Sequence, residues 1–215
     1  MKSSILTQKA YGLIKEKILT LEIKPHQRIM ENELAEDFEI SRTPVREAIK
    51  QLMSEGFIIN IPHQGYYCVA LSLKEIDEII DVRLSLETLA LKTSLKNGFT
   101  PEQLGILQNL TNEFENSVVS GDSSKINLLD SEFHRTLYEF SGNQMLIKFL
   151  RDIEDYMTIV RNMELYGLGV AKGNLALPDH KNILKALQEN DEEEAIRSLE
   201  HNINQMRINI SSSRL

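Results

Sequence analysis

The chain has 215 residues, of which 41% are apolar, with a single cysteine and a formal net charge of −8. This length is enough for one large domain or two small ones. A single cysteine excludes an intrachain disulfide and does not favour a thiolate zinc site. The N-terminus has no apolar signal region, and no stretch approaches the roughly eighteen continuous apolar residues of a membrane span. We therefore predict a cytoplasmic protein with no membrane segment, in which Cys68 is a small buried residue.

The negative charge is unevenly distributed along the chain. Residues 1–71 carry nine Lys plus Arg and nine Asp plus Glu, and the remaining fifteen basic and twenty-three acidic residues give the whole charge of −8. A neutral module can still bind DNA when its positive charge gathers on one face, because phosphate contacts depend on local charge. The charge and the helical patterns described next predict a domain over residues 1–71 and a second over residues 72–215.

Three helices and a hairpin account for the first domain. The helices are expected over residues 7–20, 31–38 and 42–55, from the spacing of their apolar residues and from Gly56, which ends the third. The short turn at Ile40 and Ser41 is typical of a helix-turn-helix. After Gly56, the segments FIINI and YYCVA flank Pro62–Gly65 and predict a two-stranded hairpin that would form a wing.

The second domain is predicted to be entirely helical. Capping pairs such as Thr100 with Gln103 and Asp191 with Glu194 mark helix starts. Six helices are expected near residues 73–96, 101–120, 123–141, 144–166, 179–189 and 192–211. Gly167–Leu177, with three glycines, is expected to be a connection. The predicted fold is mainly α, with a winged helix-turn-helix followed by an antiparallel six-helix bundle.

The third helix carries the candidate DNA-reading residues. Its apolar positions share one face, whereas Arg42, Arg46 and Lys50 form a separate basic stripe. Ser41 can cap this helix, and Pro44 lies in its first turn, where the missing amide hydrogen costs nothing. Arginine can donate two hydrogen bonds to one guanine, and a helix N-terminus suits phosphate. The alternative is a solvated charged face, which is common on helices.

The segment ENELAEDFEISRTPVREAIKQLMSEGFI, followed by a glycine-containing hairpin, resembles the winged helix of the GntR family. The resemblance implies that the recognition helix contacts DNA through the following positions: Ser41, Arg42, Thr43 and Arg46. It also implies that the wing, around His63 and Gly65, approaches the minor groove. Asn32 stands where some FadR-type members have a basic residue, so either Asn32 reaches a phosphate or the operator sequence differs.

Histidines and an aspartate in the helical half suggest a metal site. Asp130 lies four residues before His134, so both project from one helix face and could chelate one ion, although hydrogen-bonded histidines are the common alternative. LLDSEFHRTLYEFSGNQML and PDHKNILKALQENDEEEAIRSLEHNI resemble the FCD effector domain of FadR-type regulators, of the VanR-like six-helix kind. The resemblance implies the ligand set Asp130, His134, His180 and His201. Such a set suits zinc first, and nickel or manganese as well.

Arg83 resembles an arginine that faces the ligand cavity in FadR-type relatives. A guanidinium opposite a metal would clamp a carboxylate at both ends. The alternative is a surface salt bridge to Asp81 or Glu87. The clamp predicts a small organic acid as effector.

The leading hypothesis is a sequence-specific DNA-binding transcription regulator, a repressor whose operator affinity is controlled by a carboxylate metabolite bound at or near the metal. We expect a homodimer on palindromic operator DNA, and Ile76, Ile79 and Ile80 could serve either the bundle core or a dimer face. One alternative is a metal-dependent hydrolase, although no H-E-x-x-H, nucleophile elbow or phosphate loop is present. The other is a DNA-binding dimer with a purely structural metal.

Overall fold

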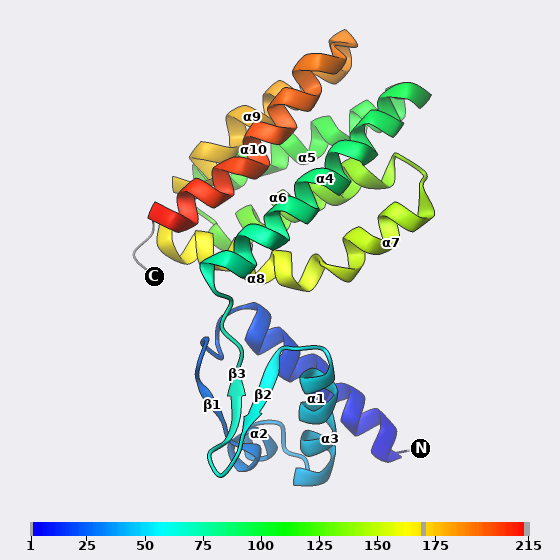
Figure 1. Ribbon diagram of the computed structural model, residues 1–215. Coiled ribbons are helices and arrows are strands. Elements are labelled where there is room, and N and C mark those ends of the chain that lie inside the picture. Colours follow the sequence, from blue (N-terminus) through cyan, green and yellow to red (C-terminus); the bar gives the residue numbers. More distant parts are fainter. Residues whose placement is uncertain (1, 169–170, 213–215) are drawn as a thin grey trace. The chain divides into compact units, whose positions relative to one another are not determined.

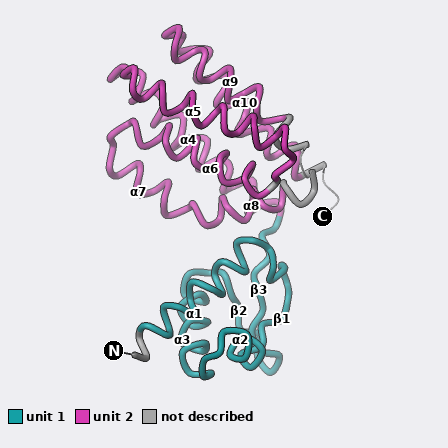
Figure 2. The backbone as a smooth tube through the Cα atoms, turned by 180° about the vertical axis from the view of Figure 1, so that it is seen from behind, with its two compact units in different colours: residues 1–72 teal, residues 73–215 magenta. Residues whose placement is uncertain are grey.

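The computed structural model describes residues 2–168 and 171–212, which form ten helices and three short strands (Figure 1). The chain divides into two compact units, residues 1–72 and residues 73–215 (Figure 2). No helix among the described residues is both long enough and apolar enough to cross a membrane.

The first unit is a small helical module with a sheet. Its elements are α1 (Lys2–Leu19), β1 (Arg28–Ile29), α2 (Glu31–Asp37), α3 (Arg42–Ser54), β2 (Ile58–Ile61) and β3 (Gly65–Cys68). Helix α1 packs along α3, and its buried residues Ala10, Ile14 and Ile18 follow helical spacing. Cys68 is buried in this unit, as predicted, and burial raises the pKa of its thiol to about 11.

The wing has one strand more than the sequence predicted. Strands β2 and β3 form the expected antiparallel hairpin, with Ile61 opposite Gly65 next to the turn. Strand β1 adds to the other edge of β3, which gives the order β1-β3-β2. A strand of two residues is too short to show an alternating pattern, so nothing in the sequence separated it from a loop.

The second unit is an all-helical bundle. Its helices are α4 (Leu73–Asn97), α5 (Pro101–Ser120), α6 (Ser123–Glu139), α7 (Gln144–Asp152), α8 (Glu154–Leu168), α9 (Ala171–Glu189) and α10 (Glu192–Ser212). Helix α10 packs against α9 and α4, and α5 packs against α6 and α9. The expected capping is confirmed: Thr100 and Gln103 form a reciprocal box, and Asp191 accepts a hydrogen bond from the backbone amide of Glu194.

Two boundaries in this bundle correct the sequence prediction. The helix expected near residues 144–166 breaks at Ile153 into α7 and α8, so the described bundle has seven helices. The break lets α7 pack on α4 while α8 packs mainly on α10 and α6, although the apolar pattern runs through without glycine or proline. The helix expected near residues 179–189 begins earlier, at Ala171, and is α9. It continues through Pro178, although proline is usually tolerated only in the first turn of a helix. Residues 169–170 of the expected connection lie outside the described residues.

The apolar residues of α4 divide between core and surface. Ile76 and Ile80 are buried in the bundle, whereas Ile79 is half-buried. The sequence allowed these three isoleucines to serve either the bundle core or a dimer face. Two of them belong to the bundle core.

Candidate functional site

Helix α3 presents the predicted DNA-reading residues on its exposed side. Its apolar face is buried, as expected, through Val45, Ala48, Ile49 and Leu52. Arg42, Thr43 and Arg46 are exposed on the other side. Ser41 occupies the N-cap position, but its side chain makes no capping hydrogen bond, so the hydroxyl is not committed to the helix as the sequence had suggested.

Both arginines of this surface contact α2. The Arg42 guanidinium donates to Oδ1 of Asn32 at 2.7 Å. Arg46 donates through Nε and Nη2 to the carboxylate of Glu31, at 2.9 and 2.8 Å, while its side chain stays 49% exposed. The hydrogen bonds from Arg46 hold the pKa of Glu31 below its ordinary value. The two guanidinium groups that the sequence predicts to read bases are therefore held beside α2 by two polar partners.

A further basic residue, Arg28 of β1, lies beside the wing turn. His63 is exposed in the β2–β3 turn with a φ of 63°, and Gly65 follows with a φ of 101°, a conformation that favours glycine. A side chain at Gly65 would meet the Arg28 guanidinium at ordinary contact distance. Sequence reasoning missed Arg28 as a candidate DNA contact, because the strand that places it beside the wing was not predicted.

Three of the four predicted metal ligands meet inside the bundle. Asp130 and His134 project from α6, and His180 projects from α9. One potential ligand atom from each residue lies within 4.8 Å of those of the other two, and all three side chains are buried. A carboxylate oxygen and two imidazole nitrogens at this separation can hold one divalent ion.

His180 gives the strongest sign that this group fits a metal. Its ring is fully buried, stacks on Phe133 with a centroid separation of 4.2 Å, and lies 4.8 Å from the ring of Phe114. Neither ring nitrogen has a hydrogen-bond partner in the structure, and Nε2 lies 3.4 Å from Oδ1 of Asp130. Because a buried polar atom without a partner costs about 1–3 kcal/mol, a bound cation would remove a real penalty here.

His134 is oriented by a buried carboxylate. Its Nδ1 lies 2.7 Å from Oε2 of Glu87, and the Nε of Arg83 donates to Oε1 of Glu87 at 2.5 Å. Burial alone would raise the pKa of Glu87, but the charges and hydrogen bonds of Arg83 and His134 lower it to about 2. In the tautomer with the proton on Nδ1, His134 donates to an ionised Glu87 and leaves Nε2 as the ligand atom, the role that carboxylates behind a ligating histidine have at metal sites.

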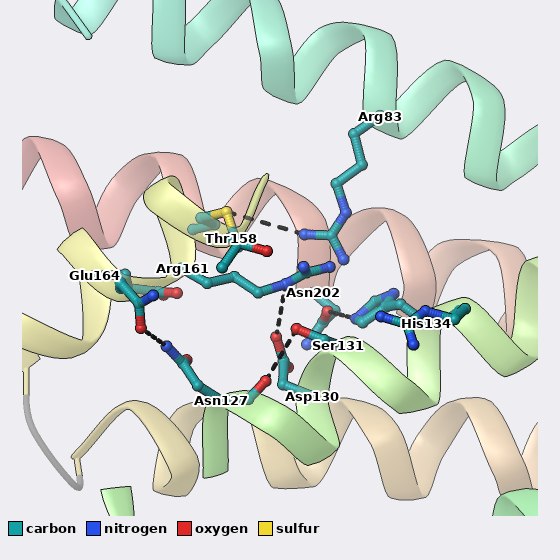
Figure 3. A network of polar contacts seen from close by, with 12 residues as sticks. Arg83, Asn127, Asp130, Ser131, His134, Thr158, Arg161, Glu164 and Asn202 are labelled. Carbon is teal, nitrogen blue, oxygen red and sulfur yellow. Dashed lines mark hydrogen bonds and ion pairs between the residues drawn. The ribbon is translucent and has the colours of Figure 1, made fainter. Parts of the chain in front are cut away.

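Asp130 is held by a second buried arginine (Figure 3). The Nε of Arg161 lies 3.4 Å from Oδ2 of Asp130, and its Nη1 donates to Glu154 at 3.1 Å. Burial lowers the pKa of His134 despite the opposing effect of Glu87. The lowered pKa favours the neutral imidazole of His134, the form in which a histidine binds a metal.

Arg83 is a buried residue of the bundle interior. It is 1% exposed, its Nη2 has no hydrogen-bond partner in the structure, and it lines a cavity of about 20 Å³ together with Asp130. Its ion pair with Glu87 is buried, while Asp81 pairs with Arg207. The alternative considered from the sequence is therefore right about Glu87 as the partner and wrong about its place at the surface. The Arg83 guanidinium is directed toward the same space as Asp130.

The structure does not bring His201, the fourth predicted ligand, into this group. Its side chain is 58% exposed, and its Nδ1 lies 3.0 Å from Asp179. The next residue on α10, Asn202, lies in the site instead, with Oδ1 at 2.9 Å from Nε2 of His134 (Figure 3). Consecutive helical residues differ by about 100° in direction, so only one of the two can face the bundle interior.

Sequence reasoning missed three residues of the site: Glu87, Arg161 and Asn202. Glu87 was considered only as a surface partner of Arg83 and lies four residues after it, which is the usual spacing of a helical ion pair. Asn202 lies at a position expected to face inward from its neighbours, because Leu199 and Met206 are buried three residues before and four after. Arg161 carries no comparable signal.

Comparison with known proteins decides the family. Residues 6–68 match the family described as bacterial regulatory proteins, gntR family, and residues 78–205 match the FCD domain family. The chain belongs to the GntR family of transcription regulators. This GntR regulator is 30% identical over 186 residues to the uncharacterized HTH-type transcriptional regulator YdhC of Bacillus subtilis, covering 86% of the chain and 82% of that protein. It is 31% identical to the gluconate operon transcriptional repressor of the same species, covering 77% of the chain and 75% of that protein.

A solved structure gives the same assignment. Escherichia coli McbR/YncC is 25% identical and superimposes with a TM-score of 0.76, covering 93% of this chain and 94% of that one. The GntR regulator therefore combines a DNA-binding winged helix with an FCD effector domain. These relatives and families are transcription regulators and not enzymes, so the hydrolase alternative falls.

Proposed function

We propose that this GntR regulator is a metal-containing repressor whose helical unit senses a small organic anion. The observation that carries the proposal is the buried His180 ring, whose two nitrogens have no hydrogen-bond partner beside Asp130 and His134. The gluconate operon repressors among the relatives favour repression over activation.

Asp130, His134 and His180 would hold the ion, with zinc first and nickel or manganese also compatible. A bound divalent ion supplies positive charge and coordination positions that an anion can occupy. Arg83 has a buried Nη2 without a partner and faces the cavity beside Asp130, so it can donate to the other end of that anion. A carboxylate metabolite offers both contacts.

The size of the cavity suggests how binding is transmitted. A volume of about 20 Å³ accommodates a single water or ion but no organic acid. An effector must therefore displace lining side chains, among which Gln205 and Asn209 of α10 are only half-buried. A ligand that rearranges α10 can bind two states of the bundle with different affinity, and this difference is what allows it to change operator affinity.

The DNA-binding unit would act as a homodimer on a palindromic operator. Arg42 and Arg46 would exchange Asn32 and Glu31 for base edges or phosphates, and Ser41 and Thr43 would contact phosphate. Asn32 would reach a phosphate from α2. The wing, through His63 and Gly65, would lie along the minor groove.

The test joins metal analysis with a thermal-shift screen of organic acids, with and without chelator. We expect stoichiometric metal in the wild type, its loss in His180→Ala, and a carboxylate that raises the melting temperature only of the metal-loaded protein. His26→Asn is a matched control, because His26 is exposed in the other unit and has a φ of 62°, which asparagine tolerates.

The effector role needs a second readout. A carboxylate that stabilises the metal-loaded protein should also weaken operator binding, and it should bind Arg83→Ala less tightly. Chelation that unfolds the helical unit, with no carboxylate response in the loaded protein, would instead establish a purely structural metal. A wild-type protein that carries no metal would refute the metal-containing regulator.

A further inference from the structure

We propose that Asn202, and not His201, supplies the fourth protein ligand of the metal centre through its amide oxygen. This inference rests on the proposed metal centre. It gives the site two imidazole nitrogens and two oxygens, in place of the three imidazoles and one carboxylate that the resemblance implied.

Asn202 and His201 lie on different faces of α10. Leu199 and Met206 are buried in the bundle, and Asn202 lies between them on the same stripe, three residues after one and four before the other. His201 is turned about 100° away from that stripe. Bringing the His201 ring inward would require α10 to rotate. That rotation would expose the buried residues through which α10 now packs against α9 and α4.

Asn202 also lies at ligand spacing from His134. Oδ1 of Asn202 lies 2.9 Å from Nε2 of His134, the nitrogen that Glu87 leaves as a ligand atom. Two ligand atoms at about 2.0–2.2 Å from one ion, at right angles, are about 3 Å apart. The spacing is therefore that of two adjacent ligands. Asn202 also lines the cavity with Asp130, so the amide and the carboxylate face the same space.

His201 already has other partners. Its Nδ1 lies 3.0 Å from Oδ1 of Asp179, and its Nε2 lies 3.1 Å from Nε2 of Gln205. Both ring nitrogens are thus engaged by other side chains, and the His201 side chain is 58% exposed. Nothing in this arrangement calls for a metal, in contrast to the ring of His180.

The exchange of an imidazole for an amide oxygen changes which ions the site prefers. Imidazole suits zinc and nickel, whereas carboxylate and carbonyl oxygens suit manganese. A site with two nitrogens and two oxygens should discriminate less strongly in favour of zinc than one with three imidazoles. Asn202 would then set the metal selectivity of the sensor.

The experiment measures the affinities of the full-length protein for Zn²⁺ and Mn²⁺ by chelator competition, together with the visible absorption of its Co²⁺ form. The variants are Asn202→His, Asn202→Ala and the neighbour control His201→Ala. We expect Asn202→His to raise the ratio of zinc to manganese affinity by at least about tenfold, because even outer-shell changes alter metal affinity by about 10–100-fold. The Co²⁺ bands should shift in the same variant and stay unchanged in His201→Ala.

Asn202→Ala should weaken Mn²⁺ binding while His201→Ala leaves both affinities unchanged. The selectivity ratio and the Co²⁺ spectrum separate ligation from a general loss of packing, since poor packing would weaken both metals together. Loss of metal in His201→Ala, with Asn202→Ala unaffected, would overturn the inference and leave the proposed metal centre standing. Absence of metal from the wild type would overturn both.

Discussion

The two units place their charged groups in opposite environments. In the DNA-binding unit, Arg42 and Arg46 lie on the surface and pair with residues of α2 that water also reaches. In the helical unit, Arg83, Glu87 and His134 are buried, and they are held by one another. Surface pairs contribute about 0–1 kcal/mol and exchange partners readily, whereas a broken buried pair leaves an unpaired charge. The first arrangement suits binding an external polyanion, and the second suits a fixed site.

The largest effect that this comparison predicts comes from removing Glu87. Glu87→Ala leaves Arg83 as a buried charge without its ion pair and should lower the free energy of unfolding by about 3–5 kcal/mol. Urea denaturation followed by circular dichroism, at fixed protein concentration and with chelator present, measures the loss. Glu78→Ala on the same helix is the control, because Glu78 pairs with Lys74 at the surface, and it should change the free energy by less than about 0.5 kcal/mol. Equal losses in the two variants would remove the contrast between the units.

The pH dependence of stability sharpens the same contrast. The folded protein lowers the pKa of Glu87 from 4.5 to about 2, so its ionised form stabilises the fold above the unfolded value. That contribution should be lost as the pH falls from about 4.5 toward about 2, because the unfolded state takes up the proton first. In chelator, Glu87→Gln should therefore show a smaller slope of unfolding free energy against pH in this window than the wild type. Glu78→Gln should keep the wild-type slope.

Removing an arginine from the surface unit should change binding and leave folding nearly untouched. Arg46→Ala should weaken binding to an operator selected from random-sequence DNA by about 1–3 kcal/mol and relax specificity at one base position. Lys50→Ala, from the same basic stripe, should weaken binding evenly across sequences if it contacts phosphate. Fluorescence anisotropy with matched and mutated operators distinguishes the two. A uniform loss in both variants would show that Arg46 reads no base.

A glycine pair tests the backbone of the two units. Gly65 in the wing has a φ of 101°, so Gly65→Ala should destabilise the DNA-binding unit by about 1–3 kcal/mol and reduce operator affinity. Gly105 lies inside α5 with no atom within 4 Å of an added Cβ, so Gly105→Ala should stabilise the helical unit by about 0.4–1 kcal/mol. Thermal melts of both variants give the signs. Stabilisation by Gly65→Ala would mean that the wing turn tolerates an ordinary side chain.

The contrast also explains what the sequence could predict. The recognition helix followed from its pattern because its buried residues and its basic stripe repeat at helical spacing within one element. Asp130 and His134 were found for the same reason, since both lie on α6. Glu87 and Arg161 meet them only through packing of α4 and α8 on α6, which no local pattern encodes.

The choice between His201 and Asn202 shows where resemblance and physics differ. The resemblance implied His201 as a metal ligand, although positions 201 and 202 face different sides of α10. The buried Leu199 and Met206 mark the inward stripe, and this spacing was available in the sequence. The break at Ile153 was not available, because neither glycine nor proline marks it.

The smallest predicted effect is the most informative about the surface unit. Glu31→Gln removes the ion pair that holds Arg46 against α2 and should raise operator affinity by at most about 1 kcal/mol, because both side chains remain partly in water. Glu47→Gln, which releases Lys50 in the same way, serves as the matched control in the anisotropy assay. The sign decides between two roles of the pair. A gain means that Glu31 competes with DNA for the guanidinium, whereas a loss as large as that of Arg46→Ala would mean that Glu31 orients Arg46 for the base it reads.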